Sequence, residues 1–449
     1  MTINFDKIKQ FIIKNKIIVI AVLIVIIGLS VITAKTYSDI KKRAGNIAWQ
    51  FDFSKLFFPK PKKSPEPTIS SSPTVTNKNT SKLSSSSSQP ESTASSGSAN
   101  SGFASCGANN SFFTNSPLDQ ADFKGLVPLG NLNPSGHVFP TDHIYFYLSN
   151  VSSRYNLYAP GNVTIISISG SEHVSQGFTD YSFDFQPCQE LRFQFGHVSS
   201  LSDKLNQALT APYDTENTYS TGGQTYRMFS KNVSIAVSAG EQLGTVGGNS
   251  GQNALDMGAY DTRKTINFAN SSRWSQRGDT THTVCPIDYY SGDLKNTLMA
   301  RFGDYDGDRK RTIEPICGTI EQDVNETSQG VWFISGTSNS WSGEDSHLAL
   351  VHDNINPNTA VFSVGTSMSS SGLSSGTYQF SPQSSGQLNR DFDEVRSDNN
   401  IYCYEPSNIS NEKIILLLTS NTNLKIEKQS GSCGFGPGSF TASASEFER

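Results

Sequence analysis

An uncharged apolar segment near the N-terminus constrains this chain more than any other feature. Residues 17–34 read IIVIAVLIVIIGLSVITA, and a helix of that length would extend about 27 Å at about 1.5 Å per residue. This is enough to cross the hydrocarbon core of a bilayer. A buried core helix and a cleaved signal peptide fit less well, because the run is long and the small-x-small cleavage site expected after it is poorly formed. We therefore predict one membrane-spanning helix at residues 17–34.

The charges around this segment do not decide its orientation. Basic residues occur on both sides, from Lys7 to Lys16 before it and from Lys35 to Arg43 after it, so the positive-inside rule favours neither direction. Long domains that follow a membrane helix are translocated largely regardless of flanking charge. We therefore predict a cytoplasmic basic tail at residues 1–16 and a single-pass plasma-membrane protein whose remaining chain is mostly extracellular.

The composition changes after a juxtamembrane segment at residues 35–63. Residues 64–105 are rich in Ser, Thr and Pro and include consecutive serines at 84–88. They contain too few large apolar side chains to offset the entropy lost by an ordered chain. We predict a disordered linker at residues 64–105, with a root-mean-square reach of roughly 35 Å if it behaves as a flexible coil.

Charge is unevenly distributed along the chain. Residues 1–100 contain 14 Lys and Arg against 5 Asp and Glu, whereas residues 101–449 contain 21 against 35. The basic part flanks the predicted membrane helix, where anionic lipids attract it. The acidic remainder would be repelled by phosphate backbones, so nucleic acid is excluded as a partner.

All six cysteines lie beyond the predicted linker, and none forms a Cys-x-x-Cys pair. An even number of cysteines in an exported region predicts up to three disulfides, whose connectivity the sequence does not reveal. The absence of close pairs argues against a cysteine-based zinc site. The residues are Cys106, Cys188, Cys285, Cys317, Cys403 and Cys433.

Beyond the linker, the sequence has the pattern of a β protein. Short runs rich in β-branched and aromatic side chains are separated by Gly, Asn, Pro and Ser, as in HIYFYLS at residues 143–149 and ELRFQF at 190–195. Runs of about four to eight residues at close spacing are typical of sandwiches and barrels. Helical patterns are few and fall at residues 203–209 and 286–302.

These patterns predict a mainly β fold. We expect two β-rich extracellular domains, sandwich-like or barrel-like, at residues 106–275 and 276–449, with few short helices. The C-terminal half contains no pattern that indicates a function.

Within residues 125–262 the order of local motifs becomes informative. APGNV at residues 159–163, GHVSS at 196–200 and AGEQLGTVG at 239–247 follow one another after a His-containing strand at 143–149. Taken in this order, they resemble the lysostaphin-type (LytM-like) zinc metallopeptidases, which cut peptidoglycan cross-bridges. The resemblance implies a β fold whose groove holds a zinc ion through three protein ligands, with one position open for water.

The positions that correspond to the zinc ligands are altered in this chain. If His143 occupies the first ligand position, Tyr147 stands where the family has Asp, and a neutral phenol binds zinc poorly. Ala254 and Asp256 stand where two histidines are expected, whereas His197 occupies the place of another active-site histidine. The candidate metal ligands are therefore His143, His197 and Asp256, and His197 is the candidate catalytic residue.

A different register would use His137 and Asp142 as the first ligand pair. Four residues separate them, which would place the two side chains on unequal faces of a strand. Another interpretation makes His137, His143 and His197 hydrogen-bonding residues in a retained groove.

We therefore expect a membrane-anchored cell-surface protein with a degenerate peptidase-like domain that binds cell-wall or surface material without cutting it. Its partners would be the membrane, through the N-terminal helix, and peptidoglycan or another surface protein. An atypical zinc metalloendopeptidase acting on peptidoglycan is the alternative, and zinc is the one cofactor considered. A structural or adhesive surface protein is the third interpretation.

Overall fold

The computed structural model describes residues 102–449, except 222–223, 275–276 and 338–342. The predicted cytoplasmic tail, membrane helix and juxtamembrane segment, and residues 64–101 of the linker, lie outside the described residues. All described residues belong to one compact unit, Asp52–Arg449. No helix in the described part is both long and apolar enough to cross a membrane.

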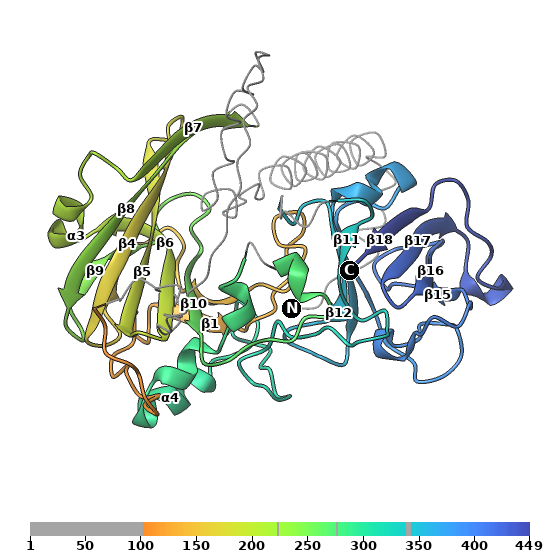
Figure 1. Cartoon of the computed structure of the whole chain (residues 1–449), viewed down its shortest axis with the longest axis horizontal. Helices are drawn as coiled ribbons and strands as arrows, with labels where there is room; N and C mark the ends of the chain where they lie inside the picture. Colours follow the sequence, from red (N-terminus) through yellow and green to blue (C-terminus); the bar gives the residue numbers. More distant parts are fainter. Residues whose placement is uncertain (1–101, 222–223, 275–276, 338–342) are drawn as a thin grey trace, which may run out of the picture. The chain divides into compact units, whose positions relative to one another are not determined.

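The predicted mainly β fold is confirmed, and the described strands form two antiparallel sheets (Figure 1). The first sheet has the order β1-β2-β10-β6-β5-β4-β8-β7, and β9 pairs with both β3 and β6. Its strands are β1 (Phe123–Val127), β2 (His143–Leu148), β3 (Tyr155–Tyr158), β4 (Val163–His173), β5 (Phe178–Cys188), β6 (Leu191–Leu201), β7 (Thr215–Thr221), β8 (Gln224–Val237), β9 (Gln242–Val246) and β10 (Ala254–Asp261).

The second sheet has the order β14-β13-β12-β11-β18-β17-β16-β15. Its strands are β11 (Gly330–Ile334), β12 (Leu348–His352), β13 (Ala360–Val364), β14 (Gly376–Phe380), β15 (Tyr402–Tyr404), β16 (Glu412–Ser420), β17 (Asn423–Ser430) and β18 (Ser445–Glu448).

Helices are few and short, as the sequence predicts. Among the described residues, the α-helices are α3 (Asp203–Ala208) and α4 (Gly292–Met299), and the 3-10 helices are Ser271–Trp274, Thr280–His282, Pro286–Tyr289, Thr366–Ser371, Phe392–Glu394 and Cys433–Phe435. The helical pattern at residues 286–302 is interrupted, because Tyr290 and Ser291 are extended. It therefore forms a 3-10 turn followed by α4.

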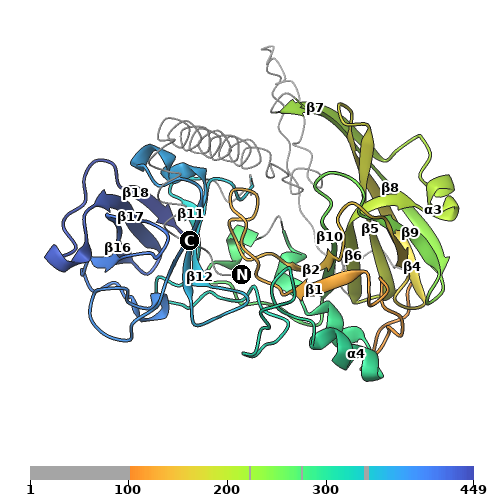
Figure 2. The ribbon, with the colours of Figure 1, turned by 180° about the vertical axis from the view of Figure 1, so that it is seen from behind.

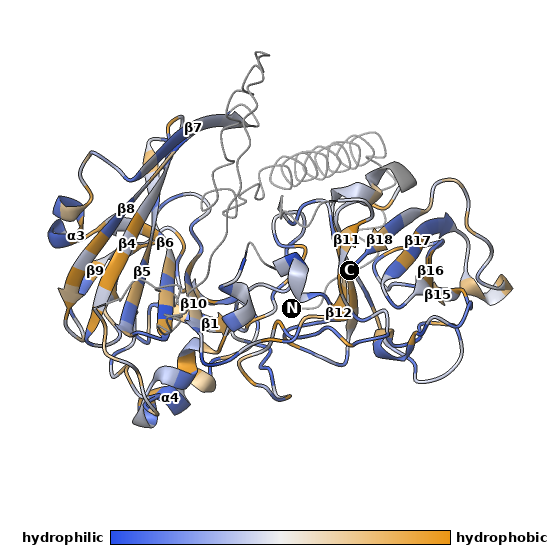
Figure 3. Cartoon of the chain, viewed as in Figure 1, coloured by the Kyte–Doolittle hydropathy of each residue, from blue (hydrophilic) through white to orange (hydrophobic). Residues whose placement is uncertain are grey.

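The two-residue period of a β-strand explains how β2 separates its side chains. Ile144, Phe146 and Leu148 are buried in the core, whereas His143, Tyr145 and Tyr147 lie on the opposite, partly exposed face. Figure 3 shows a comparable alternation of hydrophobic and hydrophilic bands along β4 and β8. β2 thus presents a row of ionisable and aromatic residues over an apolar base.

Strands β11 and β12 have side chains buried on both faces. On β11, Val331 and Phe333 join a core formed mainly by the first sheet, whereas Trp332 belongs to the core of the second sheet. On β12, Ala349 and Val351 face the first core, and Leu350 faces the second. Continuous burial of this kind explains the short uninterrupted apolar runs of these two strands.

The hydrophobic core divides later in the sequence than the boundary predicted at residues 275 and 276. Ile287, Leu298 and Phe302 all pack into the first core, and the second core begins at Trp332. The predicted boundary rested on local patterns alone, which do not reveal which core a segment joins.

The six cysteines form three disulfides, which confirms the expected number. The pairs are Cys106–Cys188, Cys285–Cys317 and Cys403–Cys433. Disulfides persist in oxidising compartments such as the extracellular space. The pairing therefore indicates an extracellular environment for the described residues.

Candidate functional site

Three neighbouring strands bring the predicted ligand residues together. β10 lies between β2 and β6 (Figure 2), with Tyr145 opposite Asp256 and Asp256 opposite Gly196. As a result, Asp256 Oδ2 lies 3.5 Å from Nε2 of His143 and 3.4 Å from Nε2 of His197. We call these three residues the His/Asp cluster.

Each imidazole of the cluster is held from behind by a carboxylate. His143 Nδ1 lies 3.1 Å from Asp142 Oδ1, and His197 Nδ1 lies 2.8 Å from Asp180 Oδ2. A carboxylate at Nδ1 favours the tautomer whose Nδ1–H donates to it, and it fixes the orientation of the ring. Both Nε2 atoms are thereby directed towards Asp256.

The support of His197 continues into a chain of hydrogen bonds. Gln252 donates from Nε2 to Asp180 Oδ1 over 2.9 Å, and Ser199 donates from Oγ to Gln252 Oε1 over 2.8 Å. Both Ser199 and Gln252 are buried. These hydrogen bonds are short and shielded from water. The network therefore orients the carboxylate of Asp180 as well as the ring of His197.

The backbone of β6 is irregular where it presents His197. His197 has φ of 60°, a left-handed conformation that is uncommon for a residue with a side chain. The β5–β6 register shifts between the Tyr181 and Phe183 pairs, as at a bulge. A left-handed histidine with a supported ring is a strained feature of the kind that gathers at functional sites.

The carboxylates raise the pKa of both cluster histidines. Burial alone would lower the pKa of His197, but Asp180 and Asp256 outweigh it and raise the pKa to about 10. At His143 burial also lowers the pKa, and the charges of Asp256 and Asp142 again outweigh it, so the pKa is raised. At His137 burial dominates, and with the nearby charge of His143 it lowers the pKa to about 3.

Two polar atoms of the cluster lack a hydrogen-bond partner among the described residues. They are His143 Nε2 and Asp256 Oδ1, and both are buried. Buried polar atoms in folded proteins are nearly always paired, with protein, water, an ion or a ligand. Of the two, His143 Nε2 faces Asp256 Oδ2 at 3.5 Å, which leaves Asp256 Oδ1 as the unsatisfied acceptor of the cluster.

The donor atoms of the His/Asp cluster are of the types that bind zinc, but the distances between them match a zinc site only in part. Imidazole nitrogen and carboxylate oxygen are usual zinc ligands, and two ligands of a tetrahedral ion stand about 3.4 Å apart. Among the described residues, the only three ligands whose donor atoms all lie within 4.8 Å of one another are Cys106, Cys188 and Glu190. The two cluster imidazoles therefore do not close around one ion with Asp256 as arranged, and the metal site stays a prediction.

Tyr147 and Ala254, which stand where lysostaphin-type peptidases have Asp and His, also lie beside the cluster. Tyr147 is paired with Ala254 across β2 and β10. Burial raises the pKa of Tyr147, and the negative charge of Asp256 raises it further. The phenol is therefore neutral at pH 7, and it cannot replace the charge of a carboxylate ligand.

A buried ion pair that the sequence analysis did not identify supports the other side of the cluster. Asp142 Oδ2 accepts a hydrogen bond from Thr280 Oγ1 over 3.0 Å. Burial raises the pKa of Asp142, but the bond from His143 and the charge of Arg277 hold it well below the usual range. Arg277 in turn lies 2.7 Å from Glu344. No local pattern connects positions so far apart, so only the fold could reveal this network.

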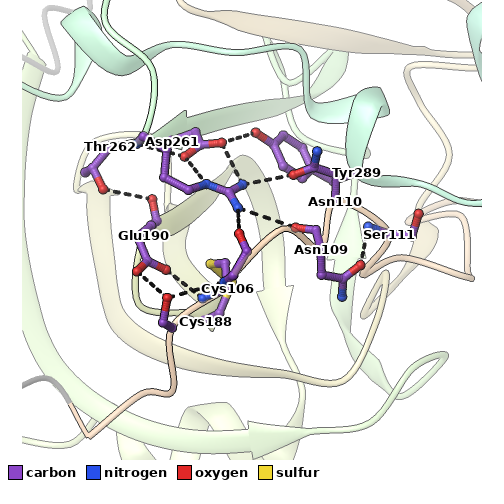
Figure 4. Close-up of a disulfide and its surroundings, with 12 residues drawn as sticks. Cys106, Asn109, Asn110, Ser111, Cys188, Glu190, Asp261, Thr262 and Tyr289 are labelled. Atoms are coloured by element: carbon purple, nitrogen blue, oxygen red, sulfur yellow. Dashed lines mark hydrogen bonds and ion pairs between the residues drawn. A yellow bond between two sulfur atoms is a disulfide. The ribbon is translucent and has the colours of Figure 1, made fainter.

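The group of Cys106, Cys188 and Glu190 joins distant segments of the chain. The two sulfurs are joined in a disulfide and are not free to ligate. Glu190 accepts hydrogen bonds from Ser105 Oγ and from the backbone N–H of Cys106, each 2.7 Å long. Figure 4 shows Glu190 beside the Cys106–Cys188 disulfide. These bonds fasten the first described residues to the turn between β5 and β6.

Arg263 extends this fastening to the end of β10. Its guanidinium binds Asp261 over 2.8 Å and donates to the carbonyl of Gly107 over 2.8 Å. Asp261 also accepts a 2.7 Å hydrogen bond from Tyr289 (Figure 4). These bonds join the first described residues to the end of β10 and to Tyr289.

Comparison with known proteins finds no matching family model, no matching curated protein and no matching solved structure. The resemblance to lysostaphin-type peptidases therefore stays a prediction based on motif order.

Proposed function

We propose that this protein is a membrane-anchored cell-surface protein whose His/Asp cluster binds cell-wall material without cutting it. The three disulfides support an extracellular position for the β domains. The membrane anchor rests on the apolar segment at residues 17–34. The cell-wall ligand rests on the motif order alone.

The observation that carries this proposal is the ion-paired state of the cluster. Asp180 and Asp256 raise the pKa of His197 to about 10, so in the absence of a metal its ring is protonated at pH 7. A protonated imidazole cannot ligate a metal, so an ion would first have to displace that proton. Asp256 Oδ1 has no hydrogen-bond partner among the described residues, and His143 Nε2 faces Asp256 Oδ2 at 3.5 Å. The cluster is thus arranged for hydrogen bonding more than for zinc hydrolysis.

Sedimentation with purified peptidoglycan tests the proposal. The full-length protein in detergent should co-sediment with the insoluble wall, and Asp256→Asn should weaken binding about tenfold or more, because a charge-assisted hydrogen bond is lost. Asp391→Asn is the matched control, since Asp391 also pairs with a histidine, His352, at 2.9 Å but near the second sheet. Equal binding by the Asp256→Asn variant and the wild type would reject the proposal.

An atypical zinc endopeptidase is the second candidate, and one specific observation favours it. Both cluster imidazoles are braced at Nδ1 by carboxylates and direct Nε2 to one carboxylate oxygen, as zinc-ligating histidines are held by their outer partners. This candidate predicts one zinc per chain, together with peptidoglycan cleavage that a chelator blocks and His197→Ala abolishes. Metal-free protein that still sediments with the wall would reject it. If the purified protein contained no zinc and did not bind the wall, the remaining interpretation would be a structural or adhesive surface protein.

A further inference from the structure

A row of aromatic rings leads away from the His/Asp cluster. His143, Tyr145 and Tyr147 project from one face of β2, with ring centroids 4.8 Å and then 6.3 Å apart. Tyr305 continues the row, with its ring centroid 5.6 Å from that of Tyr147. Tyr145 and Tyr147 are half-buried, whereas Tyr305 is 54% exposed. We call Tyr145, Tyr147 and Tyr305 the tyrosine row.

The fold holds Tyr305 at the end of this row. Asp304 accepts hydrogen bonds from the backbone N–H groups of Asp308 and Arg309, 3.0 and 3.2 Å long, which closes the turn that carries Tyr305. The turn packs closely on β1, where a Cβ on Gly307 would lie 2.6 Å from the carbonyl oxygen of Lys124. An exposed tyrosine on a fixed turn loses little further freedom on binding, which favours a role in recognition.

Hydrogen-bonding groups accompany the rings along the row. Asp256 lies opposite Tyr145 across β2 and β10, and its Oδ1 has no hydrogen-bond partner among the described residues. The charges beside Tyr305 are already paired, Asp306 with Lys124 at 3.1 Å and Asp304 with Arg309 at 2.9 Å. The row therefore offers aromatic faces beside the carboxylate of Asp256, and the ion pairs next to Tyr305 hold Asp304 and Asp306 in place.

These features discriminate between classes of ligand. An extended peptide that adds a strand needs a free sheet edge, and β2 is paired with β1 on one side and with β10 on the other. A lipid surface needs a wide apolar patch, whereas only the last ring of this row is well exposed. A pyranose ring has an apolar face of C–H groups and a rim of hydroxyls, which matches flat phenol rings beside an acceptor.

We infer that the tyrosine row is a carbohydrate-binding strip, on which sugar rings stack over Tyr147 and Tyr305 while a hydroxyl or acetamido N–H donates to Asp256. This inference rests on the proposed function, because it names the glycan strand of the wall, not its peptide, as the ligand. The His/Asp cluster then forms the buried end of a longer strip.

Titration with soluble glycan tests the inference. The full-length protein in detergent should bind a tetramer of N-acetylglucosamine, as measured by calorimetry. Tyr305→Ala should weaken this binding about three- to tenfold, the range expected for one aromatic contact, whereas Tyr305→Phe should retain it. Tyr219→Ala is the matched control, because Tyr219 is 38% exposed on β7 and stacks on Tyr226. Equal affinity of the wild type and Tyr305→Ala would overturn the inference.

A parallel titration with a glycan-free wall peptide separates this inference from the proposed function. Binding to peptide alone, unaffected by Tyr305→Ala, would overturn the carbohydrate strip and leave the wall-binding proposal in place. Failure to bind insoluble wall, glycan and peptide would overturn both. Because Tyr305 is more than half exposed, its substitution should leave the melting temperature unchanged, which confirms that a loss of binding is local.

Discussion

At the scale of single residues, His197 links the stability of the protein to its protonation. The imidazolium lies between the carboxylates of Asp180 and Asp256, 2.8 and 3.4 Å away. Removal of its proton would leave two carboxylates facing a neutral ring. The folded state therefore binds this proton more tightly than the unfolded chain does.

This linkage predicts a loss of stability at alkaline pH. The pKa of His197 rises from 6.5 to about 10 on folding, so its contribution is complete below about pH 6.5 and is lost as the pH rises through 10. The melting temperature of the wild type should fall more steeply between pH 7 and pH 10 than that of His197→Gln. His282→Gln, whose ring contacts the carbonyl of Lys264, is the control. Parallel profiles for the wild type and His197→Gln would contradict the prediction.

The Arg277–Glu344 pair makes a second residue-scale prediction. Both side chains are largely buried, and Glu344 also accepts a 3.2 Å bond from the N–H of Phe139. Arg277→Met should lower the free energy of unfolding by about 3–5 kcal/mol, because it leaves a buried carboxylate unpaired. The double variant Arg277→Met/Glu344→Gln should recover part of that loss in a denaturant titration. Additive effects of the two changes would show that the pair is not coupled.

At the scale of elements, close pairing of β6 and β9 requires a glycine. A Cβ on Gly244 would collide with the carbonyl oxygen of Ser200, whereas nothing lies within 4 Å of a Cβ on Gly376 in β14. Overpacking of this kind forces backbone shifts. The strand carrying Ser199 and the backbone that positions His197 would both be disturbed.

Gly244→Ala should therefore destabilise the protein by about 1–3 kcal/mol, whereas Gly376→Ala should change the free energy of unfolding by less than about 0.5 kcal/mol. Urea denaturation of both variants measures the difference. If Gly244→Ala left the free energy of unfolding unchanged, β9 would be free to move away from β6.

The same scale shows why some elements could be predicted and others could not. The alternation in HIYFYL predicts β2 and its two faces, because the strand period is a local property. The pattern at residues 286–302 predicts a longer helix than α4, because side-chain spacing does not report the extended backbone of Tyr290 and Ser291.

At the scale of the whole molecule, the disulfides tie distant segments of each core. Cys285 and Cys317, which flank α4, close a loop with a sequence separation of 32. Replacement of both by serine should lower the free energy of unfolding by about 3–4 kcal/mol, the loop-closure entropy expected for that length. Denaturation of the oxidised wild type and of the double variant tests this value. If the free energy of unfolding did not change, the Cys285–Cys317 disulfide would not constrain the unfolded chain.

The proposed topology makes a prediction for intact cells. Protease added outside should cleave between the membrane segment and the folded part, within residues 64–105, and release a disulfide-bonded fragment. A cytoplasmic marker protein should survive the same treatment. Protection of the C-terminal half from external protease would contradict the predicted orientation.

The strand-rich class, the capacity for three disulfides, the predicted membrane segment and the acidic character of residues 101–449 all follow from composition and short-range periodicity, which need no knowledge of the fold. Motif order alone singled out His143, His197 and Asp256. Their convergence, the braces from Asp142 and Asp180, and the alignment of Tyr305 with β2 depend on strand order and register. Strand order and register depend on which strand faces pack together in the core, and these strands are far apart in the sequence. No local sequence pattern encodes that packing.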